Sequence, residues 1–190
     1  MDRIATLLGV TPAPGGQHRG RGTRNALVRL GPRTYLEIVG PDPDQPAPIR
    51  PRWFSIDRLG EPRLVTWAAA AADIEGLANR AERSGVGIGP VQQGHRTRAD
   101  GVELSWRFTD PTVVSCDGIV PFLIDWGTSP HPAVTAPWGG ELVALRAEHP
   151  DPASVDSRLR VLDLDLAVTR GEAPALVATI RTLRGDVELR

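Results

Sequence analysis

The chain has 190 residues, of which 41% are hydrophobic and 24% are charged, and its formal net charge at pH 7 is -1. A chain of this length can bury a core without disulfides, and its near-neutral charge gives no general attraction to nucleic acid or to an anionic membrane. Its single cysteine, Cys116, excludes an intrachain disulfide.

No stretch approaches the roughly 20 consecutive apolar residues that a membrane-spanning helix requires. The first residues, MDRIATLLGV, also lack the basic segment and the long apolar segment of a secretion signal. We therefore expect a cytoplasmic protein with no membrane or nucleic-acid partner.

The first part of the chain predicts one helix and two strands. Residues 2–8 place three apolar side chains on one helical face, and Gly9 is a typical stop. A glycine- and proline-rich stretch, TPAPGGQHRGRGT, is expected to be flexible, and NALVRLG and TYLEIVG then predict two strands around a GPR turn. The proline-rich residues that follow, up to Arg52, predict an extended connector.

A second series of elements begins at Arg63. RLVTWAAA predicts a strand, and DIEGLANRAERSG predicts an amphipathic helix with Asp73 as its N-cap and Gly85 as its stop. PVQQGHRTR, VELSWRFTD and VPFLIDWG predict three strands, and the Asp-Gly pair at residues 100–101 is a strong signal for a hairpin between the first two.

A third series begins at Glu141. ELVALRAEH predicts a strand, DPASVDSRLRVLDL predicts a helix with Pro152 in its first turn, and LAVTRG, ALVATIRTL and DVELR predict three short strands. The order β-α-β-β-β thus occurs twice in full, and the first series has the same order without its opening strand. Self-similarity on this scale favours repeated supersecondary units.

The expected fold class is therefore α+β, with repeated β-α-β-β-β modules whose mixed, curved sheets enclose a cleft. Residues 1–40 form an incomplete first module, residues 41–62 a proline-rich connector, residues 63–128 a second module and residues 141–190 a third. An edge strand left without its neighbour in the first module would favour a homodimer.

This pattern resembles the vicinal oxygen chelate superfamily, which includes glyoxalase I, extradiol dioxygenases and bleomycin-binding proteins. The stretches GGQHRGRGTRNALVRLGPRTYLEIVGPDP, RLVTWAAAAADIEG, HRTRADGVELSWR and VPFLIDWGTSPHPA are most similar to its glyoxalase-like domain group. The resemblance covers most of residues 1–150, and the last third resembles the carboxy-terminal extension of that group. It implies the glyoxalase/bleomycin-resistance/dihydroxybiphenyl dioxygenase fold.

The resemblance also implies a divalent metal ion, which the superfamily commonly holds with His and Glu residues on the first and last strands of two units. The last-strand position matches Glu37 in YLEIV and, by position, Asp125 in the second unit. The first-strand position of the second unit falls near Trp67, which cannot bind a metal. A typical member would carry a His-bearing strand ahead of the first predicted helix.

The strand pattern places Glu37 on one face with Tyr35 and Val39, opposite Leu36 and Ile38. If the two aliphatic residues face the core, Glu37 faces the cleft, where a carboxylate needs a partner. Glu37 is then a candidate metal ligand or catalytic base, and the alternative is a solvent-facing acid.

Asp125 is also a candidate metal ligand, with an arginine partner as the alternative interpretation. Other side chains are candidates for substrate binding, through hydrogen bonds from His and Asn, stacking by Trp, or carboxylate clamping by Arg. For each of these, solvent exposure, a turn or core packing is the alternative. The candidates are His18, Asn25, Trp67, Arg96, Arg107 and Trp126.

Three hypotheses about the function remain open at this point. The first is a metal-assisted lyase, isomerase or oxygenase acting on a small oxygenated molecule, with Glu37 moving a proton. The second is a non-catalytic protein that binds a small aromatic or apolar ligand, and a scaffold that dimerises through exposed strands is a third hypothesis. No nucleotide cofactor is expected, because GVGIGP follows a helix and ends in proline.

Overall fold

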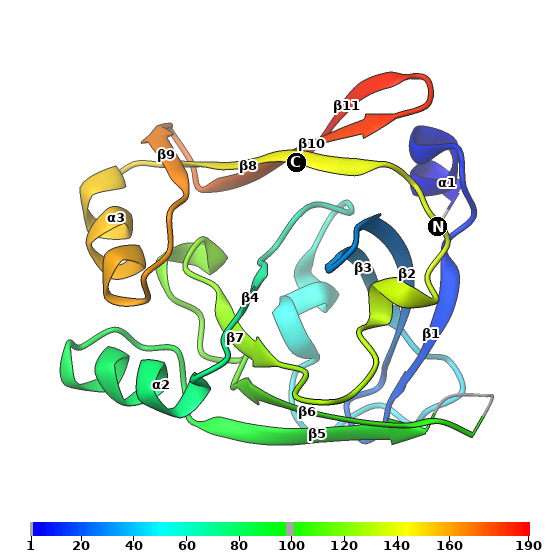
Figure 1. The fold of residues 1–190 in the computed structure, drawn as a ribbon, viewed down its shortest axis with the longest axis horizontal. Coiled ribbons are helices and arrows are strands. Elements are labelled where there is room, and N and C mark those ends of the chain that lie inside the picture. The colour runs from blue at the N-terminus through cyan, green and yellow to red at the C-terminus, as the bar shows by residue number, and fades with distance from the viewer. Residues whose placement is uncertain (1, 98–100) are drawn as a thin grey trace. The chain divides into compact units, whose positions relative to one another are not determined.

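The computed structural model of the protein describes residues 2–97 and 101–190. In these ranges it contains helices α1 to α3 and strands β1 to β11, arranged in three sheets that include both parallel and antiparallel pairs (Figure 1). This confirms the predicted α+β fold class. No helix within the described ranges is long and apolar enough to cross a membrane.

The chain forms two compact units, and each unit is built from separate parts of the sequence. Unit 1 contains Met1–Pro62, His131–Ala144 and Ala178–Leu189, and unit 2 contains Arg63–Pro130, Leu145–Val177 and Arg190. These units group the elements differently from the three modules expected at residues 1–40, 63–128 and 141–190. The common interior of those modules stays a prediction.

A three-stranded antiparallel sheet and a helix form the amino-terminal part of unit 1. Strand β2 lies in the middle of this sheet and pairs with β1 on one side and β3 on the other. Leu8 of the helix packs with Val28, Leu30 and Ile180 in the core of the unit. The elements are α1 (Asp2–Leu8), β1 (Ala13–His18), β2 (Thr23–Gly31) and β3 (Thr34–Pro41).

Strand β1 corrects the prediction of a flexible glycine-rich stretch before β2. Its sequence, APGGQH, has low intrinsic strand propensity. It is nevertheless a strand, because it pairs along β2 from Ala13↔Leu27 to His18↔Thr23, with a bulge between Pro14 and Gly16. Tertiary pairing here overrides local propensity.

The register of this sheet decides which side chains share a face. Leu36 and Ile38 pack against the core that contains α1. Glu37 therefore points to the other face, together with Asn25, because Leu27↔Glu37 and Asn25↔Val39 are paired. His18 joins this face because it is paired with Thr23, two residues before Asn25.

The predicted proline-rich connector is only partly extended. It contains a short 3-10 helix, Trp53–Arg58, interrupted by Phe54 and Ser55 in the left-handed conformation, with φ of 59° and 50°. Asp42, the second residue of the connector, is only 2% exposed. It is thus an ordered part of unit 1 rather than a simple spacer.

Unit 2 contains the complete second β-α-β-β-β series, and its sheet has the strand order β4-β7-β6-β5. The opening strand β4 pairs in parallel with the last strand β7, and β5 and β6 form the predicted antiparallel pair. Asp100 of the predicted Asp-Gly turn lies outside the described residues. The elements are β4 (Ala68–Ala70), α2 (Ile74–Arg83), β5 (Val91–Thr97), β6 (Glu103–Thr109) and β7 (Phe122–Asp125).

The helix of this series agrees with its prediction, whereas the opening strand does not. Asp73 caps α2 by accepting a hydrogen bond from the Gly76 amide at 3.0 Å, and Ile74 and Ala81 are fully buried. The strand predicted for RLVTWAAA is confined to β4, because it pairs only with three residues of the short strand β7.

The third series has the predicted order of elements, but its strands pair in a different order from those of the second series. Its sheet has the order β11-β10-β8-β9, so the opening strand β8 lies beside β9 and not beside the last strand. Helix α3 forms the crossover between the parallel strands β8 and β9 (Figure 1). The elements are β8 (Glu141–His149), α3 (Pro152–Val161), β9 (Ala167–Arg170), β10 (Ala175–Thr182) and β11 (Gly185–Leu189).

Candidate functional site

Four polar side chains meet on the face of the unit 1 sheet that points away from α1. Asn25 Nδ2 donates a hydrogen bond to Glu37 Oε1 at 2.7 Å and lies 3.3 Å from His18 Nε2. His18 Nδ1 lies 2.8 Å from the hydroxyl of Thr23, and His18 Nε2 lies 3.6 Å from Glu37 Oε1. We call Thr23, His18, Asn25 and Glu37 the Glu37 site.

One protonation state of His18 satisfies both of these ring contacts. With the proton on Nδ1, the ring donates to the Thr23 hydroxyl and accepts from Asn25 Nδ2 through Nε2. The His18 side chain is 18% exposed and the Glu37 side chain 33% exposed, so both are reachable by a small molecule. The site therefore combines a carboxylate and an imidazole that solvent or a ligand can contact.

Trp53, from the connector, borders the Glu37 site. Its ring lies 5.0 Å from the His18 ring, and the Arg21 guanidinium lies over the Trp53 ring, 4.9 Å from the ring centroid. The indole Nε1 of Trp53 and the Oδ1 of Asn25 are buried and have no hydrogen-bond partner within the described residues. Buried polar atoms without a hydrogen-bond partner are unusual in folded proteins.

A set of hydrogen bonds holds the connector against the turn between β1 and β2. The carbonyl of Gly22 accepts from the Asp42 amide at 3.0 Å and from Arg52 Nε at 2.8 Å. Gln45 donates to Asp42 Oδ2 at 2.8 Å and to the Thr23 carbonyl at 3.2 Å. The hydrogen bond from Gln45 lowers the pKa of Asp42, so this buried carboxylate stays ionised.

The metal ion implied by the superfamily does not fit this arrangement. Catalytic zinc sites use three protein ligands, and among the described residues no group of three His, Cys, Asp or Glu side chains is placed to hold a metal. His18 and Glu37 are the only ligand-type side chains of the Glu37 site, and the amide hydrogens of Asn25 point at both of them. A cation between them would meet N–H donors instead of lone pairs.

Asp125, the second predicted metal ligand, belongs to unit 2 and has an arginine partner. Arg107 Nη2 donates to Asp125 Oδ2 at 2.5 Å, the Gly127 amide donates to Oδ1 at 2.8 Å, and Glu75 of α2 lies 3.9 Å from Arg107. Hydrogen bonds from Arg107 and Gly127 lower the pKa of Asp125. Asp125 also shares a strand face with Leu123, which is 1% exposed in the core beneath α2.

The other substrate-binding candidates also lie in unit 2 and make structural contacts there. Trp67 Nε1 donates to the Ile119 carbonyl at 2.7 Å. Trp126 is 9% exposed, and its ring lies 5.1 Å from that of Trp106. Arg96 lies on β5, paired with Leu104 of β6. Of the candidates, the structure thus brings together His18, Asn25 and Glu37 in unit 1 and, separately, Arg107 and Asp125 in unit 2.

Sequence reasoning missed three residues at or beside the site: Arg21, Thr23 and Trp53. Thr23 is fully buried and begins β2, so its hydroxyl is placed by the strand pairing with His18. Trp53 lies in a connector that has no periodic pattern to indicate burial. The only available signal was an aromatic pair, Trp53 and Phe54, within a stretch otherwise rich in proline and charge.

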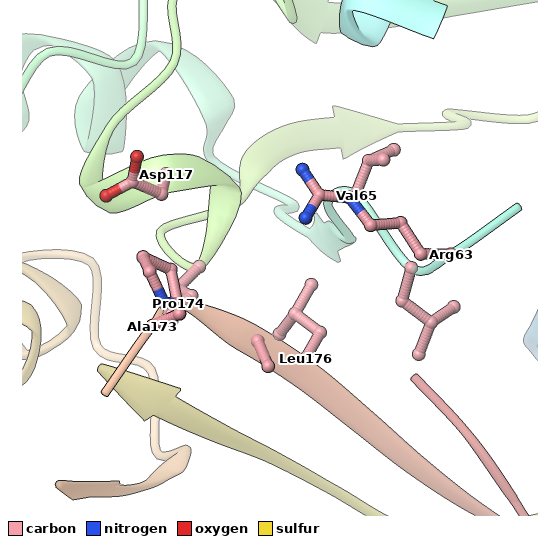
Figure 2. A pocket seen from close by; sticks show the side chains of 9 residues that line it. Arg63, Val65, Asp117, Ala173, Pro174 and Leu176 are labelled. Carbon is pink, nitrogen blue, oxygen red and sulfur yellow. The ribbon is translucent and has the colours of Figure 1, made fainter. Parts of the chain in front are cut away.

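Unit 2 contains a cavity of about 160 Å³ that none of the predicted site residues lines. Figure 2 shows the Arg63 side chain extending toward the turn that carries Asp117, above Pro174 and Leu176. That turn is left-handed from Cys116 to Gly118, with φ of 46°, 56° and 89°. Only glycine fits at its last position, because a Cβ there would lie 2.1 Å from the Val65 carbonyl oxygen.

The fold has a counterpart among solved structures. A hypothetical protein from Staphylococcus aureus matches with a TM-score of 0.58 and 15% sequence identity, over 94% of this chain and 75% of that chain. This likeness shows the fold alone.

The family follows from the sequence match. A model of the glyoxalase-like domain family matches residues 1–162, and the chain belongs to this family, which is of the vicinal oxygen chelate type. A search of curated proteins finds no match to the chain. The match includes the whole Glu37 site and ends after α3.

Proposed function

We propose that the protein acts on a small oxygenated molecule at the Glu37 site, as an isomerase or lyase that uses Glu37 to accept a proton. The observation that carries this proposal is the carboxylate of Glu37, held by Asn25 at 2.7 Å and placed 3.6 Å from the His18 ring. A positioned carboxylate beside an imidazole is a typical arrangement for general acid–base catalysis.

The proposed chemistry uses only groups that the chain supplies. Glu37 takes a proton from a carbon next to a carbonyl, and the electron pair moves to the carbonyl oxygen. In an isomerase, the adjacent hydroxyl group gives its proton to the enolate oxygen, and Glu37 returns the carbon-bound proton to the former carbonyl carbon. In a lyase, the electron pair instead expels a leaving group from the carbon on the other side of the deprotonated carbon. Neither outcome needs an oxidant. Asn25 orients the carboxylate, and His18 is within reach of the same reacting groups. No step is assigned to a metal, because the Asn25 amide hydrogens lie between the two ligand-type side chains.

Proton exchange with solvent tests this proposal without knowledge of the physiological substrate. The protein is incubated in D2O with a panel of small 2-oxo and 2-hydroxy carbonyl compounds, and the loss of C–H signals is followed by NMR. We expect Glu37→Gln to slow the exchange at least about 100-fold, since a positioned base contributes this much or more. Glu61→Gln, a matched change at a side chain that is 81% exposed, is expected to leave the rate unchanged. Equal exchange rates for the wild type, Glu37→Gln and Glu61→Gln would refute the proposal.

A second candidate, a non-catalytic binding protein for a small aromatic ligand, is favoured by Trp53. Its ring borders the Glu37 site, and its buried Nε1 has no partner among the described residues. This function predicts saturable quenching of tryptophan fluorescence with no proton exchange. Trp53→Phe keeps a ring but removes the N–H group, so it is expected to weaken binding, while Trp106→Phe in unit 2 serves as the control.

A further inference from the structure

An open cavity of about 340 Å³ lies at the surface of unit 1, where the turn between β1 and β2 meets the connector, and Ile49 in its wall is fully exposed. Its walls combine glycine and proline backbone with two arginine side chains and one isoleucine, and they contain no acidic residue. The lining residues are Gly20, Arg21, Pro48, Ile49, Arg50 and Pro51.

Arg21 and Arg50, the two arginines of this cavity, form no ion pair among the described residues, whereas nearby arginines do. Arg24 and Arg52, close by in the sequence, lie 3.9 Å and 2.7 Å from carboxylates of Asp44 and Asp57. In contrast, neither Arg21 nor Arg50 forms an ion pair within the part of the chain that the structure describes. The cavity therefore carries two positive charges that no side chain neutralises, which is the condition for binding an anion.

Trp53 and His18 lie between the cavity and Glu37. Arg21, in the cavity wall, lies 4.9 Å from the centroid of the Trp53 ring, and this ring lies 5.0 Å from that of His18. His18 in turn lies 3.6 Å from Glu37. A small molecule with its anionic group in the cavity would reach Glu37 by extending past the Trp53 ring.

The backbone around the cavity is held in place before any ligand binds. Gly20 and Gly22 are both left-handed, with φ of 73° and 64°, and the Gly20 amide donates to Gln45 Oε1 at 3.2 Å. Pro48 packs so closely on Gly22 that a Cβ there would lie 2.6 Å from its Cδ. Such preorganisation lowers the entropy cost of binding.

From these contacts we infer that the cavity binds the anionic group, a carboxylate or a phosphate, of the molecule acted on at the Glu37 site. This inference rests on the proposed function for its reacting end, whereas anion binding itself can be measured alone. Arginine is suited to both anions because its planar guanidinium makes paired hydrogen bonds to two oxygens.

Calorimetric titration of the full chain with inorganic phosphate and, separately, with malonate tests the inference. We expect saturable binding of at least one probe, and the tighter probe shows whether phosphate or carboxylate is preferred. Arg50→Ala and Arg21→Ala are each expected to raise the Kd about tenfold or more, as for the loss of a charge-assisted hydrogen bond. Arg58→Ala removes the same charge from the exposed end of the 3-10 helix and is expected to change the Kd less than about twofold.

Glu37→Gln separates this inference from the proposed function. It is expected to leave the Kd of the anionic probe nearly unchanged, because Glu37 does not line the cavity. A loss of proton exchange with intact anion binding supports both ideas, and intact exchange with intact binding refutes only the proposed function. The inference is overturned if neither probe binds, if Arg58→Ala weakens binding as much as Arg50→Ala, or if a short oligonucleotide binds more tightly than either probe.

Discussion

The side chain of Asn25 connects the parts of the Glu37 site, because its amide nitrogen contacts both the carboxylate and the imidazole. The oxygen of the same amide faces the bulge of β1, where Gly15 lies between the paired residues Pro14 and Gly16. A Cβ on Gly15 would lie 2.2 Å from Asn25 Oδ1. Because glycine has no Cβ, Gly15 leaves room for the Asn25 amide to take this orientation.

Gly15→Ala is expected to displace the Asn25 amide and to break its hydrogen bond to Glu37. The clash falls on the end of a flexible side chain, so the amide rotates away at a small cost in stability while the site loses its orientation. We expect proton exchange to fall by about tenfold or more, with a change in unfolding free energy below about 1 kcal/mol. Gly40→Ala in β3, where a Cβ meets no atom within 4 Å, is the matched control. Unchanged exchange in Gly15→Ala would contradict the role of Asn25.

At the level of elements, periodicity predicts the helices and most strands because each buries one regular face. Helix α2 and strand β3 show this, since the apolar positions of the helix recur at helical spacing and Leu36 and Ile38 alternate onto the core face of β3. Strand β1 and the 3-10 helix beginning at Trp53 have no such pattern. β1 is ordered by pairing with the next strand, β2, and the 3-10 helix follows Arg52, which is held by a hydrogen bond to Gly22, 30 residues earlier in the chain.

In the candidate site too, periodicity predicts some features, whereas others depend on contacts between elements. Glu37 could be predicted because alternation along β3 shows which face it takes. Its contact with His18 could not, since the bulge in β1 shifts the register by one residue and brings His18 opposite Thr23. The arginine partner of Asp125 was one of two alternatives that the sequence left open, and only the pairing Arg107↔Asp125 between β6 and β7 decides it.

Arg52→Ala is expected to release the connector from the turn between β1 and β2. Arg52 donates to the Gly22 carbonyl at 2.8 Å and to Asp57 at 2.7 Å, with its side chain 19% exposed. Loss of these contacts should lower the unfolding free energy by about 1 to 2 kcal/mol. Chymotrypsin should then cleave faster after Trp53 or Phe54 in the native protein, whereas Arg58→Ala should leave cleavage unchanged. Equal protection of both variants would show that Arg52 does not hold the connector.

On the scale of the whole molecule, each unit contains segments that are far apart in the chain. Unit 1 combines α1, near the amino end, with residues 178–189. Ile180 of β10 is fully buried against Leu8, Val28 and Leu30. This residue lies beyond residues 1–162, the part matched by the family model. The core beneath the Glu37 site is thus completed by a strand outside the matched region.

Ile180→Ala is therefore expected to destabilise the unit that carries the Glu37 site. Truncation of a fully buried isoleucine costs about 2 to 5 kcal/mol, from lost burial and the cavity left behind. Leu183→Ala, just past the same strand at a residue 88% exposed, should change stability by no more than about 0.5 kcal/mol. Urea unfolding of both variants measures the difference. If Ile180→Ala unfolds like the wild type, β10 is not part of the core of unit 1; if it unfolds early, the strands after residue 162 stabilise a site formed entirely before them.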